Sequence, residues 1–111
     1  MISGDGFRKL AMAFPGTTEA PHFERTSFRV KNKIFATMTA GGDEAMVRVV
    51  PPDAALALID EHPDVFFSYG GWTTNGGSVG VRLRSVPVKM LKELLRVSYE
   101  HSARKPARSR R

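Results

Sequence analysis

Basic side chains recur along the segments of this sequence in which apolar and polar residues alternate. They are Arg25, Arg29, Lys31, Lys33, Arg48, Arg82 and Arg84, and we find no acidic residue on the strands that these segments predict. Guanidinium and ammonium groups gathered on one face of a sheet can contact phosphates, which is how proteins hold the backbone of nucleic acid. A solvated sheet face, whose charges discourage edge pairing, has the same composition. Both interpretations are open, and clustering of these side chains on one face would favour phosphate binding.

The one tryptophan, Trp72, stands among four glycines in residues 69–77 (YGGWTTNGG). Its indole ring could stack on a nucleic-acid base. Alternatively, the ring could fold back over the edge of the core, because flanking glycines let a large ring lie flat. We favour the folded-back position. The glycines do not follow the GxGxxG or phosphate-loop spacing, so they do not predict a phosphate cradle.

No spacing of reactive side chains predicts catalysis or a metal centre. Residues 98–101 (SYEH) are consecutive, and neighbours on a helix point in different directions, so they cannot act together as a catalytic triad. The histidines His22, His62 and His101 stand about 40 residues apart and lack the close spacing of a metal-ligand pair. We therefore expect a non-enzymatic protein with no catalytic residue, no metal and no cofactor. Ser98 is expected to be a small packing residue.

The positive charge is concentrated at the C-terminal end. The formal net charge is +6, and five positive charges lie in the last eight residues, on Arg104, Lys105, Arg108, Arg110 and Arg111. Without these five, the 17 basic side chains fall to 12 against 11 acidic ones, so the remainder of the chain has a net charge of +1. We expect residues 1–103 to form a single domain and residues 104–111 to be a disordered basic tail.

Composition excludes several classes of protein. Cysteine is absent, which excludes disulfides, thiolate catalysis and cysteine-based metal sites. No apolar run approaches the ~20 residues of a membrane span. The N-terminal sequence MISGDGFRKL lacks the pattern of a secretory signal. We expect a cytoplasmic monomer that does not contact membranes.

Residues 28–38 (FRVKNKIFATM) predict the β-hairpin around which the fold is organised. A two-residue loop would pair Val30 with Phe35, whereas a three-residue loop at 31–33 would pair Val30 with Ile34. A slip of one residue turns every side chain of a strand to the other face, so only one register can be right. We favour the three-residue loop. The side chains left facing water are then Arg29, Lys31, Phe35 and Thr37.

The remaining elements follow from periodicity. Alternation predicts strands at 27–31, 34–38, 46–50 and 78–84, and a short apolar run at 65–67 could add another. Helical periodicity predicts helices at 3–14, 53–61 and 88–103, while the polar segment 17–25 is expected to be a connection. This order predicts an α+β two-layer sandwich, in which helices pack on one face of an antiparallel sheet. The expected core is Phe7, Leu10, Phe14, Phe28, Val30, Val47, Val49, Leu58, Val79, Val81, Leu91 and Leu95.

Four stretches of the chain resemble the MmcQ/YjbR family of small bacterial proteins. They are FPGTTEAPHF (14–23), SFRVKNKIFATM (27–38), WTTNGGSVGVRL (72–83) and LLRVSYEHSARK (94–105), and the resemblance spans about Phe7 to Lys105. It implies a CyaY-like (frataxin-like) α+β fold with a double-wing sheet, and DNA binding as the function. The chain departs from some members at residues 68–71, where Ser-Tyr-Gly-Gly replaces a His-Met-Asn-Lys-type sequence.

Three functions therefore remain under consideration, and the least favoured is a small enzyme or ligand carrier with a pocket between the sheet and the helices, which a deep pocket with convergent polar groups would favour. The preferred one is a DNA-binding module that uses the basic sheet face, Trp72 and the basic tail. Its expected contact residues are Arg29, Lys31, Lys33, Arg48, Trp72, Arg82, Arg84, Arg104, Lys105, Arg108, Arg110 and Arg111. The alternative is a protein-interaction module that docks a partner through the Trp72 loop. An exposed apolar patch around Trp72 would favour the alternative.

Overall fold

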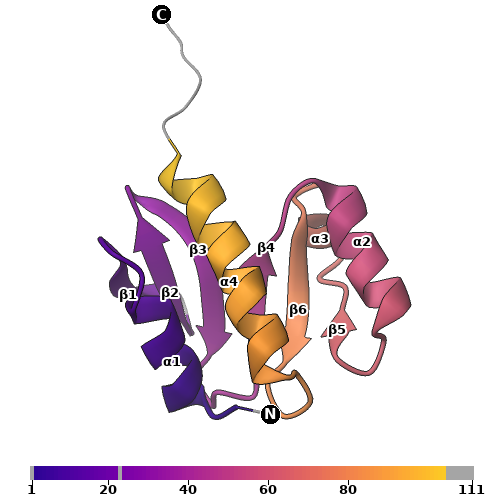
Figure 1. Cartoon of the computed structure of the whole chain (residues 1–111), viewed down its shortest axis with the longest axis horizontal. Coiled ribbons are helices and arrows are strands. Elements are labelled where there is room, and N and C mark those ends of the chain that lie inside the picture. Colours follow the sequence, from indigo (N-terminus) through magenta and orange to yellow (C-terminus); the bar gives the residue numbers. More distant parts are fainter. Residues whose placement is uncertain (1, 23, 105–111) are drawn as a thin grey trace, which may run out of the picture.

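The computed structural model describes residues 2–22 and 24–104. Its elements in chain order are α1 (Gly4–Met12), β1 (Thr18–His22), β2 (Arg25–Val30), β3 (Lys33–Thr39), β4 (Glu44–Arg48), α2 (Pro52–Glu61), β5 (Phe66–Phe67), α3 (Gly71–Thr74), β6 (Ser78–Arg82) and α4 (Val88–Ala103). Within the described residues, the strands form one antiparallel sheet in the order β1-β2-β3-β4-β6-β5 (Figure 1). The predicted α+β class with an antiparallel sheet is confirmed. None of the described helices is long and apolar enough to cross a membrane.

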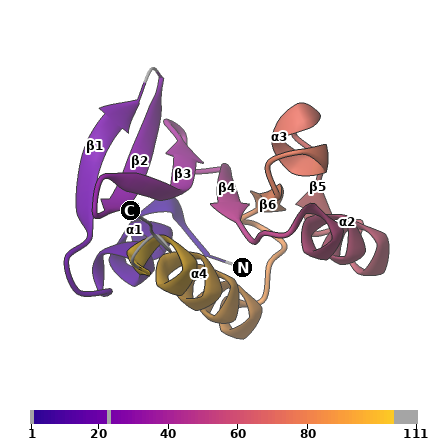
Figure 2. The same cartoon turned by 90° about the horizontal axis from the view of Figure 1, so that it is seen from above.

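Helices cover the two faces of the sheet unequally. Figure 1 shows α1 and α4 in front of the strands, and α4 packs against β2, β3 and β4. Seen from above, the short helix α3 lies on the opposite side of the sheet from α4 (Figure 2). Helix α2 packs against α3, β5 and β6. The other face of β2, β3 and β4 has no helix lying across it among the described residues, and we call it the open face.

The core lies between the covered face of the sheet and helices α1 and α4. Phe28, Ala36, Val47 and Val79 are successive cross-strand partners and form a buried row across four strands. Leu91 and Leu95 of α4 are also fully buried. Most of the predicted core residues are therefore confirmed. The exceptions, which are only half-buried, are Leu10, Phe14 and Leu58.

The hairpin adopts neither of the two registers considered, so the predicted three-residue loop is wrong. Val30 pairs with Lys33 across a two-residue turn, Lys31-Asn32, whose φ angles are 52° and 65°. Two positive φ angles are typical of the type I′ turn, which matches the twist of paired strands. A β-bulge between Phe28 and Arg29 then shifts the pairing, and no partner in β2 faces Phe35.

Phe35 and Thr37 are both buried, although both were expected to face water, and the bulge explains the position of Phe35. Phe35 has no exposed surface, and its ring lies 6.4 Å from that of Phe14 and 5.7 Å from that of Tyr99. Thr37 is buried on the open face, where Arg25 packs over it. Lys31 is exposed as predicted, whereas Arg29 is half-buried.

Ser98 of α4 has a polar role that the sequence did not predict. A bulge leaves one residue out of the hydrogen-bond ladder. The buried Ser98 hydroxyl donates a hydrogen bond of 2.7 Å to the carbonyl oxygen of that residue, Phe35. This bond ties α4 to the irregular point of β3.

Replacing Ser98 by alanine is expected to lower the free energy of unfolding by about 1–3 kcal/mol, because the buried carbonyl loses its donor. Urea denaturation measures the change. Ser102→Ala is the matched control, since the Ser102 hydroxyl is buried on the same helix without a hydrogen-bond partner among the described residues. Equal losses in the two variants would contradict the assigned role of Ser98.

Strand β1 corrects the prediction that residues 17–25 form a connection. It pairs with β2 along five residues, from Thr18 with Arg29 to His22 with Arg25. Its sequence, TEAPH, has no apolar alternation, so its pairing depends on backbone hydrogen bonds and not on a buried side-chain row. The edge position also accommodates Pro21. Glu19 of this strand forms an ion pair with Arg8 of α1.

Candidate nucleic-acid interface

A hollow of about 760 Å³ lies on the open face, and we call it the sheet hollow. Residues of β2, β3 and β4 form its floor on the sheet, and Tyr69, Trp72 and Gly76 line it from the segment around α3. In Figure 2 this is the side on which α3 stands, away from α4. A volume of this size is typical of ligand-binding sites.

The lining of the sheet hollow carries one sign of charge. Its basic residues are Arg25, Arg29, Lys33 and Arg48, and no acidic residue is among the described residues that line it. Alternation in β2 explains part of this set, because Phe28 faces the helices and Arg25, Ser27 and Arg29 therefore face the open side. Of the predicted contact residues, the fold thus brings together Arg29, Lys33, Arg48 and Trp72.

Arg25 is held in place by neutral groups. Its Nε donates a hydrogen bond of 3.1 Å to Thr37 Oγ1, and its Nη2 donates one of 3.0 Å to the Tyr69 hydroxyl. The guanidinium carbon lies 5.3 Å from the centre of the Tyr69 ring, a cation–π distance. These contacts fix the orientation of the guanidinium, and none of them is with an acidic residue. A guanidinium has five N–H donors, so donors remain for an anion in the hollow.

Arg29 is positioned through the edge strand. Its Nε donates a hydrogen bond of 3.1 Å to Ser27 Oγ. The Ser27 hydroxyl is buried and donates in turn to the carbonyl oxygen of Ala20 in β1, at 2.9 Å. Strand β1 therefore fixes Ser27, and Ser27 orients Arg29 within the sheet hollow.

Trp72 stands out from the surface, so the folded-back position is wrong. Its side chain is 68% exposed, the largest value among the exposed large apolar residues described. The buried position in α3 belongs instead to Thr73, whose hydroxyl accepts a hydrogen bond of 2.8 Å from the Tyr69 backbone N–H. Because Thr73 occupies the buried position of the short helix, the residue before it, Trp72, is left exposed and lines the sheet hollow.

The other predicted contact residues lie elsewhere. The Arg82 guanidinium stacks 4.8 Å from the centre of the Phe67 ring and donates to the carbonyl oxygen of Pro63. The cross-strand partner of Arg82 is Glu44, because β4 begins two residues earlier than predicted. The expectation that the predicted strands carry no acidic residue is therefore wrong. Lys31, Arg84 and Arg104 are exposed but do not line the hollow. The remaining predicted contact residues lie outside the described residues, and they are Lys105, Arg108, Arg110 and Arg111.

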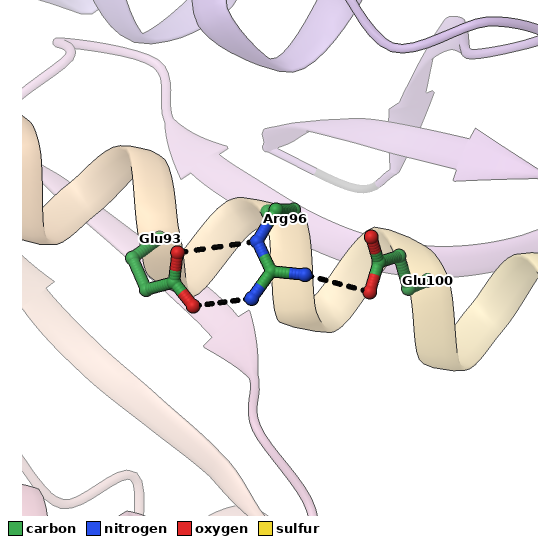
Figure 3. Close-up of polar contacts among 3 residues, drawn as sticks. All are labelled: Glu93, Arg96 and Glu100. Atoms are coloured by element: carbon green, nitrogen blue, oxygen red, sulfur yellow. Dashed lines mark hydrogen bonds and ion pairs between the residues drawn. The ribbon is translucent and has the colours of Figure 1, made fainter.

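The exposed arginine of α4, unlike the arginines of the sheet hollow, has acidic partners. Arg96 of α4 lies between Glu93 and Glu100 and forms ion pairs with both (Figure 3). Hydrogen bonds to Glu93 and then to Glu100 raise the pKa of Arg96, and the bond from Arg96 lowers the pKa of Glu93. This charge is compensated within the protein, whereas no acidic residue in the described part of the chain lines the sheet hollow. Among the described residues, no three His, Asp or Glu side chains are placed to hold a metal ion.

His101 reports on the positive field near the hollow. Burial lowers the pKa of His101, and the charges of Arg48, Arg104 and Lys33 lower it further, because they disfavour the imidazolium form. Arg48 and Lys33 both line the sheet hollow. The field of the hollow therefore extends to the C-terminal part of α4.

Replacing Arg48 by glutamine is expected to raise the pKa of His101, since one of the charges that oppose protonation is removed. A titration of the His101 ring signals by NMR measures the shift. Lys89→Gln, at the start of the same helix, should leave the pKa where it is. An unchanged pKa in the Arg48 variant would show that the field does not reach His101.

Two side chains of the hollow were missed by sequence reasoning as contact residues. Arg25 belonged to the basic set in the sequence but not to the expected contacts, although it is four residues from Arg29 and alternation puts both on one face. Tyr69 carries no such signal, since it approaches Arg25 from a segment 44 residues away in the sequence.

Comparison with known proteins gives a family and a similar solved structure. The sequence model of the family described as YjbR matches residues 12–101, a range that includes every residue lining the sheet hollow. Among solved structures, the chain is similar to the crystal structure of Deinococcus radiodurans protein DR2400, which has a DUF419 domain. The two share 28% sequence identity with a TM-score of 0.76, over 89% of this chain and 77% of that one. No curated protein matches the chain.

Proposed function

The chain belongs to the YjbR family, and we propose that it binds nucleic acid through the open face of its sheet. The observation that carries the proposal is the lining of the sheet hollow, where four basic residues gather with no acidic residue among the described residues there. Phosphate oxygens are the partners that such guanidinium groups take most readily. Arg25, Arg29, Lys33 and Arg48 are the proposed phosphate contacts, and Trp72 stands beside them.

The basic C-terminal residues assist this surface in the proposal. Five positive charges in the last eight residues add long-range attraction for a polyanion. They supply affinity without selectivity, because a run of exposed charges has no defined geometry for a base or a sugar. The sheet hollow supplies the part of the binding that depends on the fold.

A salt titration separates the two contributions. The affinity for labelled single-stranded and duplex DNA is measured by fluorescence anisotropy at increasing salt, for the full chain and for a chain without residues 104–111. Each neutralised phosphate contributes about 0.7 (single strand) or 0.9 (duplex) to the slope of log K against log salt. Four contacts in the hollow should therefore leave a slope of roughly 3 in the shortened chain, with a steeper slope in the full chain.

Loss of all binding in the shortened chain, even at low salt, would refute a nucleic-acid role for the domain. A second function would then be favoured by one observation, the 68% exposure of Trp72. Exposed tryptophans are frequent anchors in protein–protein interfaces. The protein-interaction module would then be the better description of the chain, with Trp72 as its anchor.

A further inference from the structure

We infer that the sheet hollow takes nucleic acid as a single strand, with one base stacked on Trp72 and the adjoining phosphates on Arg25, Arg29 and Arg48. This inference rests on the proposed function and specifies its ligand. It also gives Trp72 a role that charge alone does not provide.

The first argument is the combination of groups that share the hollow. Trp72 presents an aromatic surface at 68% exposure, and the same hollow is lined by three arginines. A flat apolar ring beside guanidinium groups matches a nucleotide, which joins an aromatic base to an anionic phosphate. Base stacking on aromatic side chains and a basic groove for the backbone are the two parts of single-strand recognition.

The second argument is the rigidity of both parts. Arg25 is fixed by Thr37 and Tyr69, and Arg29 is fixed by Ser27. Trp72 is carried by a short helix that Thr73 anchors to the Tyr69 backbone. Tyr69 therefore connects the arginine side of the hollow to the Trp72 side. A site whose groups are held before the ligand arrives loses less conformational entropy on binding.

The third argument excludes a duplex as the preferred ligand. Bases in a duplex are stacked on one another, so an indole ring reaches a base face only after the base is unpaired, at a cost of a few kcal/mol. Phosphates of a duplex could still contact the arginines. Trp72 would then remain in water, and its exposure would contribute nothing to binding.

Trp72 is the only tryptophan, so its fluorescence reports stacking directly. The full chain is titrated with oligothymidylate, with an abasic oligomer of the same length, and with a duplex of the same length. Only oligothymidylate is expected to quench the fluorescence of Trp72. Oligodeoxyuridylate and oligouridylate arms, which differ only in the sugar, distinguish DNA from RNA, and the tighter of these two strands identifies the sugar that the site prefers.

Substitution gives the second readout, measured by anisotropy of the labelled strands. Trp72→Ala should weaken binding of the single strand roughly 5- to 150-fold, the effect of losing one stacked base, and leave duplex binding within about twofold. Trp72→Phe should retain part of the affinity, because a phenyl ring also stacks. Leu56→Ala, at another exposed apolar side chain on α2, is the control and should change neither affinity.

The outcomes separate the inference from the function on which it rests. Equal binding of single strand and duplex, without quenching and without an effect of Trp72→Ala, overturns the single-strand inference and leaves nucleic-acid binding intact. Absence of binding to every strand, at low salt and with the full chain, overturns both. Two results together support both the inference and the function: oligothymidylate quenches the fluorescence of the parent chain, and Trp72→Ala weakens the binding of the single strand.

Discussion

Replacing Arg29 and Arg48 together with glutamate is expected to weaken the binding of a labelled single strand on the order of 10²- to 10⁴-fold. Each substitution removes a charge-assisted hydrogen bond to a phosphate, worth about 1.5–3 kcal/mol, and tenfold in affinity corresponds to about 1.4 kcal/mol. Both side chains line the sheet hollow without an acidic partner among the described residues there. Anisotropy at fixed, low salt measures the loss.

The control for this double variant has the same net charge. Lys89→Glu with Lys92→Glu changes two exposed residues of α4, which lies on the opposite side of the sheet from α3. Either pair of substitutions lowers the formal net charge from +6 to +2. Only the Arg29 and Arg48 pair should lose binding, while both variants keep the melting temperature of the parent. Similar losses in the two variants would show that net charge, and not the sheet hollow, governs affinity.

Phe35→Ala is expected to lower the free energy of unfolding by about 3–5 kcal/mol, a large part of the total for a domain of this size. The ring has no exposed surface and packs edge-on against Phe14 and Tyr99, so its removal leaves a cavity where β3 meets α4 and the end of α1. Chemical denaturation measures the change.

This variant also decides between hairpin registers. In the register favoured from sequence, Phe35 faces water and its replacement would change stability by at most about 0.5 kcal/mol, as for an ordinary surface substitution. Leu56→Ala, at 42% exposure, sets that baseline. A Phe35→Ala protein as stable as the Leu56→Ala protein would contradict the bulged hairpin.

Periodicity alone was sufficient for the elements with a buried face. Helix α4 spans Val88–Ala103, as its apolar stripe predicts. Strands β2, β3, β4 and β6 lie where alternation placed them, with ends shifted by a few residues. A helix or strand that buries one side must repeat its apolar residues at a fixed period, so the sequence carries the signal for these elements.

The remaining elements bury too little to leave such a signal. Strand β1 is a polar edge strand, and α3 has four residues, fewer than a periodic pattern needs. The carbonyl oxygen of Phe35 at the bulge accepts its hydrogen bond from Ser98, 63 residues further along the chain. A contact of that separation is set by packing and not by local sequence preference.

The candidate site also has residues that the sequence could predict and residues that it could not. Alternation along strands places Arg29 and Arg48 on the open face, and both could be predicted. The position of Trp72 could not, because it depends on which neighbouring residue α3 buries, and that residue is Thr73. The sequence also could not predict that Arg82 lies outside the hollow, since this follows from the stacking of its guanidinium on Phe67.

Mapping the bound strand by NMR tests the central claim most directly. The backbone amide signals of the full chain are followed during titration with oligothymidylate. The claim predicts that the largest shifts lie at the sheet hollow, in residues 25–29, 34–37, 46–48 and 69–78, and that the outer face of α4 around Arg96 does not respond. Shifts confined to residues 104–111, or centred on α2 and α4, would contradict binding at the open face of the sheet.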